Sequence, residues 1–205
     1  MIKCAILGAS GHGKVIAEMA ELNGFNHITF FDDRFPALTQ MAHWPVKGDS
    51  ADLVTSVLEF DLVVVAIGNN AIRLRKLLLL QQAGAKLKPL VHPKATVSCY
   101  AQLGDGTVVM ANAVINAFAS VGIGGIINTN ASVDHDCLLA DGVHISPGAN
   151  LAGGVRVGDQ SWIGIGSQIK QMTCIGNQVT VGAGATVIRD VPDFQTVIGT
   201  PAMAI

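Results

Sequence analysis

Two histidines lie in a short, mostly aliphatic stretch, "ASVDHDCLLADGVHIS", at residues 131–146. His135 stands between Asp134 and Asp136, and His144 follows nine residues later. A carboxylate beside an imidazole holds one tautomer of the ring and raises its basicity, which suits a general base. The stretch therefore predicts proton-transfer chemistry centred on His135, with Asp136 or Asp134 as the supporting acid.

Metal binding is the alternative chemistry for these histidines. The repeat region described below contains only three of them, His92, His135 and His144, and His92 lies at its very start. This spacing does not favour a three-histidine zinc site. The four cysteines show no CxxC spacing, which argues against a zinc knuckle or a disulfide framework and favours a reduced cytoplasm. We therefore expect no metal cofactor.

A period of six residues organises the second half of the chain. An aliphatic residue recurs at every sixth position from Val91 to Val187, 17 times in succession, usually with a small residue two positions earlier. Hexapeptide periodicity is typical of a parallel β-helix, in which stacked coils share one core. Three hexapeptides form one triangular coil, so the 96 residues from 91 to 186 predict about five coils.

Because residues 18 positions apart stack on one another, the sequence indicates which residues lie near His135. Gly153 falls one coil after His135, where a glycine leaves room for a ligand over the ring and offers a bare backbone N–H for an oxyanion. His144 is half a coil from His135 and so lies on another side of the prism. Two histidines placed this way cooperate more readily across a subunit boundary than within one chain.

The first half of the chain alternates strand and helix patterns. The expected elements, in order, are a strand at 3–9, a helix at 13–24, a strand at 27–33, a helix at 50–60, a strand at 61–69 and a helix at 70–85. This order predicts a small doubly wound sheet. We expect Ser50 to cap its helix, and the near-continuous β-branched run at 61–69 to be a central strand. Residues 1–88 then form a Rossmann-like α/β domain, and residues 89–205 form the β-helix.

A glycine-rich turn, "GASGHGK" at residues 8–14, follows the first strand and opens the first helix. Free N–H groups at a helix N-terminus bind phosphate, and Asp32 and Asp33 end the next strand, where an acid meets a ribose. The spacing G-x-x-G-x-G departs from the dinucleotide pattern, so it favours a nucleotide diphosphate over NAD. A turn without a ligand is the alternative. His12 is either a solvent-exposed neighbour of the helix cap or a substrate contact.

Composition excludes several classes of protein. Of the 205 residues, 50% are hydrophobic but only 5% aromatic, and the formal charge is -2, without a basic stripe for nucleic acid. The N-terminus lacks a signal-peptide pattern, and the apolar run at 77–80 is too short to span a bilayer. We expect a cytoplasmic protein.

The combination of motifs resembles a known family. The matching stretches are "ILGASGHGKVIAE", "FFDD", "AIGN", "INTNASVDHDC", "VHISPGANLAGGV" and "VGAGATVIRDVPDFQTVIGTPA", which are spread over essentially the whole chain. They resemble bacterial nucleotide-sugar acetyltransferases that join a Rossmann-like domain to a left-handed β-helix. The greatest similarity is to the UDP-4-amino-sugar N-acetyltransferases of the bacillosamine pathway, with sialic-acid O-acetyltransferases as relatives.

The resemblance implies roles for individual residues. His135 would be the catalytic base, and Asp136 would fill the following acidic position, where a longer Glu is common. The residues expected to bind acetyl-CoA are His144, Gly153, Ile165 and Ala183. The residues expected to bind the nucleotide sugar are Ser10, Gly11, His12, Asp32, Asp33, Gly68, Asn69 and Asn128. Of these, Gly68 and Asn69 belong to the "AIGN" stretch that ends the third strand. The resemblance also implies a homotrimer with active sites between neighbouring β-helices.

The expected function is direct, acetyl-CoA-dependent N-acetylation of the 4-amino group of a UDP-linked amino-trideoxy sugar in bacterial glycan biosynthesis. Two alternatives remain open. One is a sugar O-acetyltransferase of the sialic-acid type, which acts on a hydroxyl group. The other is a non-catalytic trimeric scaffold that only binds a nucleotide sugar.

Overall fold

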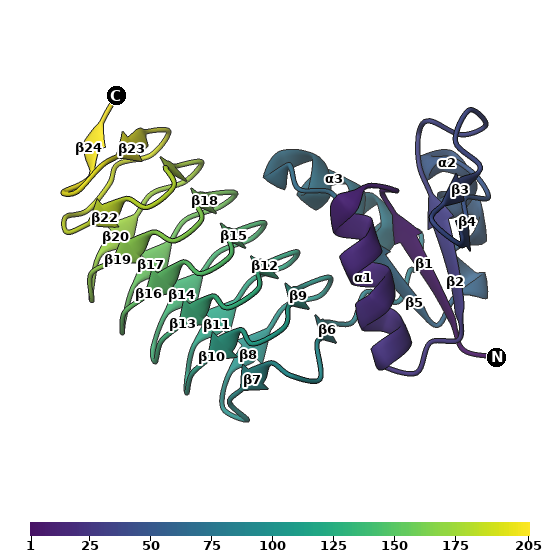
Figure 1. The fold of residues 1–205 in the computed structure, drawn as a ribbon, viewed down its shortest axis with the longest axis horizontal. Coiled ribbons are helices and arrows are strands. Elements are labelled where there is room, and N and C mark those ends of the chain that lie inside the picture. The colour runs from purple at the N-terminus through teal and green to yellow at the C-terminus, as the bar shows by residue number, and fades with distance from the viewer. The chain divides into compact units, whose positions relative to one another are not determined.

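The computed structural model describes residues 1–205 and divides them into two compact units, Met1–Leu90 and Val91–Ile205 (Figure 1). The division falls where the period-six pattern begins. Each unit encloses its own set of buried aliphatic side chains. None of the helices combines the length and the hydrophobicity needed to cross a membrane.

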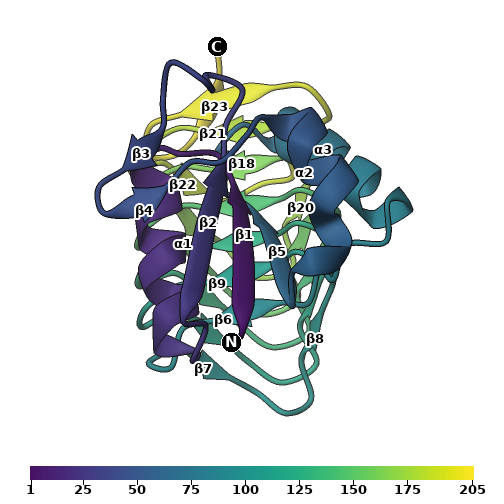
Figure 2. The ribbon, with the colours of Figure 1, turned by 90° about the vertical axis from the view of Figure 1, so that its right-hand side faces the viewer.

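The first unit is a Rossmann-like α/β domain built on a three-stranded parallel sheet with the order β2-β1-β5. The strands are β1 (Lys3–Leu7), β2 (His27–Phe31) and β5 (Leu62–Val65). The helices are α1 (Gly11–Leu22), α2 (Ser50–Ser56) with the 3₁₀ turn η1 (Val57–Glu59), and α3 (Asn70–Gln82). A short hairpin joins β3 (Gln40–Met41) to β4 (Trp44–Pro45). Helices α1 and α2 both pack on β1 and β2, from opposite sides of the sheet (Figures 1 and 2).

Two local expectations for this unit are wrong. Strand β5 is not central but lies at an edge of the sheet, and β1 is the central strand. Its run of apolar residues is nevertheless explained, because all four residues of β5 are buried. The cap of α2 is Asp49 rather than Ser50. The Asp49 carboxylate accepts hydrogen bonds from the N–H groups of Ala51 and Asp52, while the Ser50 hydroxyl turns toward Asp33.

The second unit is a parallel β-helix whose two- and three-residue strands stack into three sheets. The first sheet contains β6 (Leu90–Val91), β9 (Val108–Val109), β12 (Ile126–Ile127), β15 (His144–Ile145), β18 (Trp162–Ile163), β21 (Thr180–Val181), β23 (Thr196–Ile198) and β24 (Met203–Ala204). The second contains β7 (Thr96–Val97), β10 (Val114–Ile115), β13 (Ser132–Val133), β16 (Asn150–Leu151), β19 (Gln168–Ile169) and β22 (Thr186–Val187). The third contains β8 (Gln102–Leu103), β11 (Ser120–Val121), β14 (Leu138–Leu139), β17 (Arg156–Val157) and β20 (Cys174–Ile175).

The stacking register is the predicted one. Residues 18 positions apart pair in parallel, so His144 has Ile126 on one side and Trp162 on the other. Every member of the period-six series from Val109 to Val187 is buried in one continuous core. The stack also continues beyond Val187. Strand β23 pairs with β21 at an offset of 16 residues, from Thr180 to Thr196, so the last turn is shorter and escapes a period-six search.

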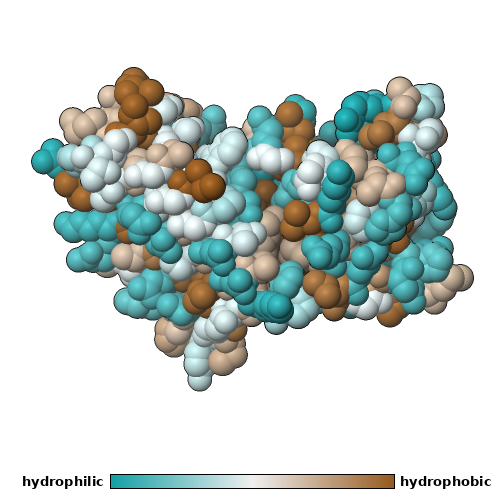
Figure 3. Space-filling model, viewed as in Figure 1, coloured by the Kyte–Doolittle hydropathy of each residue, from teal (hydrophilic) through white to brown (hydrophobic).

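Hydrophobic surface gathers at the C-terminal end of the β-helix. Figure 3 shows it at the end formed by β23 and β24. The exposed large hydrophobic residues of this segment are Ile198, Met203 and Ile205.

Candidate active site

His135 lies at a corner of the β-helix, between β13 and β14, with its side chain 61% exposed. Its Nδ1 is 2.8 Å from a carboxylate oxygen of Asp136. An ionised carboxylate only accepts hydrogen bonds, so Nδ1 carries the proton and Nε2 presents its lone pair. A tautomer held in this way is prepared to accept a proton at Nε2.

Backbone contacts fix the same corner. Asp136 adopts a left-handed conformation with φ of 58°, which Asp tolerates better than most residues. The Asp134 carboxylate accepts one hydrogen bond from the His135 N–H and another, also of 2.8 Å, from the side-chain amide of Asn116 one coil earlier. The two acids that flank His135 therefore differ in role: Asp136 contacts the ring, and Asp134 holds the backbone.

Gly153 lies directly against the imidazole of His135. A β-carbon at this glycine would stand 2.5 Å from Nε2 and 2.6 Å from Cε1 of the ring. The sequence predicts room for a ligand over the ring at this glycine, but the ring itself occupies that space. Only a residue without a side chain permits this placement of Nε2.

The charges around His135 raise its pKa above the usual value. The largest cause is the hydrogen bond with the Asp136 carboxylate, followed by the negative charge of Asp134. Both carboxylates favour the imidazolium, so the ring becomes a stronger base than an isolated histidine. This shift strengthens the capacity of Nε2 to remove a proton from a substrate.

A second group of predicted residues lines a cavity of about 390 Å³ beside β15, β18 and β21. His144, Ile165 and Ala183 all contribute to its wall. His144 is only 8% exposed, and its Nε2 is 3.2 Å from the side-chain amide nitrogen of Asn128. The structure thus brings four predicted residues together: His144, Ile165, Ala183 and Asn128. His135, Asp136 and Gly153 do not line this cavity.

The glycine-rich turn of the first unit is sterically constrained. Gly8 has φ of 112°, and a β-carbon there would stand 2.7 Å from the Ala66 carbonyl oxygen. A β-carbon on Gly13 would meet the Gly8 carbonyl oxygen at 2.3 Å. Gly11, in contrast, faces open space. The turn borders a cavity of about 250 Å³ at the carboxyl ends of the strands, whose wall includes Ser10, Asp32, Asp33 and Gly68.

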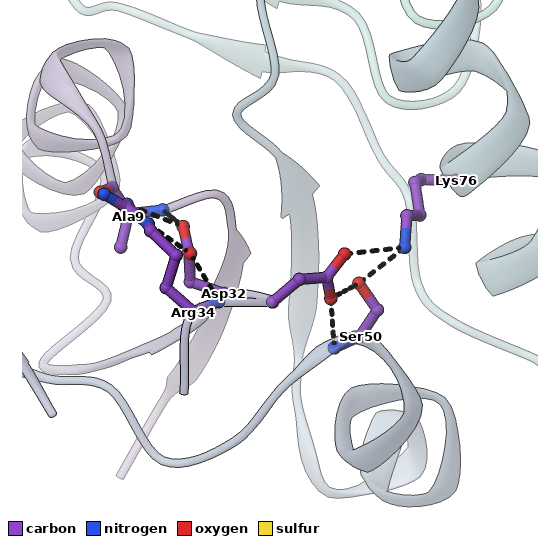
Figure 4. Close-up of polar contacts among 6 residues, drawn as sticks. Ala9, Asp32, Arg34, Ser50 and Lys76 are labelled. Carbon is purple, nitrogen blue, oxygen red and sulfur yellow. Dashed lines mark hydrogen bonds and ion pairs between the residues drawn. The ribbon is translucent and has the colours of Figure 1, made fainter. Parts of the chain in front are cut away.

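Both aspartates of this cavity already have protein partners (Figure 4). Asp32 accepts hydrogen bonds from the Ala9 N–H, at 2.7 Å, and from the guanidinium of Arg34, which holds the Asp32 pKa down at about 2. Asp33 accepts hydrogen bonds from the backbone and hydroxyl of Ser50, and Lys76 Nζ lies 3.2 Å from its other oxygen. Lys76 also donates to the Ser50 hydroxyl at 2.6 Å.

His12 and Asn69 are the remaining two predicted substrate contacts, and both interact with neighbouring residues of the first unit. His12 is partly buried, its Nε2 is covered and has no hydrogen-bond partner, and burial together with the positive charge of Arg73 lowers its pKa to about 4. The solvent-exposed alternative for His12 is therefore wrong. The Asn69 side-chain oxygen accepts the Ile72 N–H and caps α3. Arg73 donates to the carbonyl oxygens of Ile67 and Gly68 and so holds the "AIGN" turn.

Several residues of these sites cannot be found by sequence reasoning. Arg34, Ser50 and Lys76 come from separate elements, and no spacing rule joins them to Asp32 and Asp33. Trp162 lines the same cavity as His144, and here a signal exists, because it follows His144 by one 18-residue coil. The structure gathers no group of three or more His, Cys, Asp or Glu side chains suited to a metal ion.

Comparison with known proteins covers both units. The family described as the PglD N-terminal domain matches residues 3–77. UDP-N-acetylbacillosamine N-acetyltransferase of Bacillus subtilis (strain 168) is 38% identical over 113 residues, 54% of this chain and 52% of that protein. The match thus spans about half the length of this curated relative.

Solved structures of similar proteins match nearly the whole chain, including the following two. The acetyltransferase domain of PglB from Neisseria gonorrhoeae FA1090, in complex with acetyl coenzyme A, is 46% identical, with a TM-score of 0.95 over 99% of this chain and 98% of that one. PerB from Caulobacter crescentus, in complex with CoA and GDP-perosamine, is 36% identical, with a TM-score of 0.94 over 99% and 97% of the two chains. With both units matched at this level, the chain belongs to the β-helix family of bacterial nucleotide-sugar N-acetyltransferases.

Proposed function

We propose that this protein transfers the acetyl group of acetyl-CoA to the 4-amino group of a UDP-linked amino-trideoxy sugar in bacterial glycan biosynthesis. The observation that carries the proposal is the contact of 2.8 Å between His135 and Asp136. It leaves the Nε2 lone pair of a strengthened base to accept a proton, on a side chain that is 61% exposed. The complexes of similar proteins with acetyl coenzyme A and with GDP-perosamine support both substrate classes.

The first step needs a free amine. An ammonium group has no lone pair, so the sugar amine attacks the thioester carbonyl carbon only when its proton is removed. Once the ammonium proton has passed to solvent, the neutral amine attacks, and His135 Nε2 accepts one of its two N–H protons as the new C–N bond forms. Asp136 stabilises the resulting imidazolium through Nδ1–H. General-base assistance of this kind contributes about 10²–10⁴ in rate.

The second step breaks the bond from the carbonyl carbon to sulfur. The tetrahedral intermediate carries a negative oxygen, and the backbone N–H of Gly153, whose residue lies against the His135 ring, is the proposed donor that stabilises it. Collapse of the intermediate expels CoA as a thiolate, which takes the proton held by His135. The products are the acetamido sugar and free CoA, and no covalent enzyme intermediate forms.

The two cavities divide the substrates between them. The cavity lined by His144, Ile165 and Ala183 suits acetyl-CoA, because its wall combines aliphatic groups with a few polar atoms. The cavity at the carboxyl ends of the first unit's strands suits the nucleotide diphosphate. Ser10 lines this cavity and is the N-cap of α1, and the N–H groups at a helix N-terminus bind phosphate. Uridine is the proposed base. Guanosine, the nucleoside of the PerB ligand, is the discriminating alternative.

We also propose a homotrimer with active sites between neighbouring β-helices. In a single chain the side chains of His135 and Asp136 are 61% and 63% exposed. A base that works beside a reactive thioester needs water excluded from the reaction. The flank of a second β-helix supplies the missing wall and brings a His144 cavity to each His135.

A substrate panel tests this function. The purified protein is incubated with acetyl-CoA and, in parallel, a UDP-4-amino sugar, the GDP-linked counterpart and free sialic acid. Free thiol release and product mass are then followed. Transfer of one acetyl group to the UDP-amino sugar is the expected result. Acetylation of sialic acid alone indicates the O-acetyltransferase, and binding without thiol release indicates the scaffold; either outcome contradicts the proposal.

A further inference from the structure

Trp162 forms an extended contact with the predicted acetyl-CoA residue His144. The two residues are paired neighbours on β18 and β15. Their rings stack with centroids 5.4 Å apart and planes only 13° from parallel. The indole N–H of Trp162 donates a hydrogen bond of 2.6 Å to the hydroxyl of Ser146. Ser146 is buried, so this anchor lies below the surface, whereas Trp162 as a whole residue is 44% exposed.

A separate network fixes the edge of the same imidazole. The Asn128 side-chain oxygen accepts the Thr129 N–H at 2.8 Å, which turns the Asn128 amide nitrogen toward His144. That nitrogen is a donor, so Nε2 of His144 accepts and the ring proton resides on Nδ1. Asn128 thereby selects the tautomer, while Trp162 restrains the plane of the ring.

We propose that Trp162 is a positioning residue for acetyl-CoA binding and acts through His144, with Ser146 as its anchor. The inference rests on the proposed function, in which His144 contacts acetyl-CoA. Imidazole rotation about its side-chain torsions is opposed on one face by the stacked indole and on one edge by Asn128. An imidazole held in this way loses less freedom when a ligand packs against it.

Three substitutions separate the contribution of the stacked ring from that of its hydrogen bond. Trp162→Leu removes the stacked ring and weakens acetyl-CoA affinity about fivefold, the usual range for an aromatic pair. Ser146→Ala leaves the indole but removes its anchor, and weakens affinity about threefold, as for one neutral hydrogen bond. Trp162→Phe keeps a stacked ring without the N–H, so its effect equals that of Ser146→Ala.

The second tryptophan provides a matched control. Trp44 lies on β4 of the first unit, and its indole N–H also donates to a side chain, Glu21 Oε1, at 2.8 Å. Trp44→Phe therefore removes a comparable hydrogen bond and leaves acetyl-CoA affinity unchanged. It also leaves Trp162 as the only fluorophore of its kind, so a shift of its emission in a Ser146→Ala background reports release of the indole.

The decisive experiment is a thermodynamic cycle between Trp162 and His144, with acetyl-CoA affinity measured by calorimetry on the full chain. His144→Ala alone weakens binding about tenfold. If Trp162 acts through His144, adding Trp162→Leu to His144→Ala changes the affinity no further. Circular dichroism and the thermal midpoint of each variant check that the fold is kept.

The outcomes that overturn the proposal have different signatures. If the Trp162 and His144 effects multiply, Trp162 contacts acetyl-CoA directly and is not a positioning residue. If His144→Ala leaves the affinity unchanged, the role of His144 in the proposed function fails, and the positioning role fails with it. If Trp162→Leu leaves acetyl-CoA affinity unchanged while His144→Ala still weakens it, Trp162 has no positioning role and the proposed role of His144 stands.

Discussion

Gly153 lies beneath the imidazole of His135, so close that a β-carbon on the glycine would stand 2.5 Å from the ring nitrogen Nε2. The backbone at Gly153 does not require glycine, because its φ is not in the left-handed region. The reason for a glycine at this corner is therefore the neighbouring ring. His135, Asp136 and Gly153 form one local unit that spans two coils.

Gly153→Ala is expected to lower turnover about 10²-fold, because the added methyl group pushes Nε2 out of position. The ring lies at the end of a rotatable side chain, so it moves aside and the fold is kept. Steady-state kinetics and a thermal midpoint measure both effects. In a His135→Ala background the clash partner is gone, so the same substitution should leave the midpoint unchanged. Full turnover in Gly153→Ala would contradict the geometry.

The pH dependence of kcat/KM follows from the raised pKa of His135. The base works only unprotonated, so kcat/KM rises with pH through that pKa and levels off above it. Asp136 is the largest cause of the raised pKa, so Asp136→Asn moves the inflection to lower pH and lowers the plateau. Asp105→Asn, at an exposed carboxylate of another coil, serves as the control and leaves the profile in place. If the inflection of kcat/KM stays at the same pH in Asp136→Asn, Asp136 is not the cause of the raised pKa of His135.

Acid stability is expected to depend on His12. Burial and the charge of Arg73 lower its pKa from 6.5 to about 4. The unfolded chain thus takes up a proton before the folded one, and stability falls as pH decreases from about 6.5 to 4. The loss reaches at most about 3 kcal/mol. His12→Gln should flatten this part of a urea-unfolding series, whereas His43→Gln, at an exposed histidine, should not. Identical slopes for His12→Gln and the parent would refute the burial argument.

Lys76→Met is expected to weaken nucleotide-sugar binding about tenfold, because it removes the cation that contacts both Asp33 and Ser50. Acetyl-CoA affinity should not change, since its proposed residues lie in the other unit. Lys86→Met removes a comparable but more exposed ion pair with Asp61 and is the control. Calorimetry with both ligands separates the two effects. Loss of acetyl-CoA binding instead would point to a general defect in the fold.

The period-six pattern predicts most of the β-helix because one short rule governs it. Each coil buries the same positions, so the sequence alone assigns Val109 through Val187 to the core. The rule stops where the repeat changes length, as between Thr180 and Thr196. Strand order in the first unit follows no such rule. The apolar residues of β5 indicate burial, but an edge strand covered on both faces has the same composition as a central one.

The candidate sites are predictable where function follows from local spacing. His135 and Asp136 are adjacent, and Gly153 follows by one coil, so their contact is accessible from the sequence. The contacts of Asp33 are not, because Ser50 and Lys76 reach it from α2 and α3 and depend on how the sheet is wound. The stacking of Trp162 is equally inaccessible from the sequence, since it depends on ring orientation as well as on register.

The most direct test of the account is the turnover of His135→Ala with acetyl-CoA and a UDP-4-amino sugar, followed by thiol release and product mass. His43→Ala serves as the histidine control, since that ring is exposed in the first unit. We expect His135→Ala to fold normally, to bind acetyl-CoA and to lose about 10²–10⁴ in kcat, while His43→Ala is unaffected. Near-normal turnover by folded His135→Ala would contradict the assignment of His135 as the base.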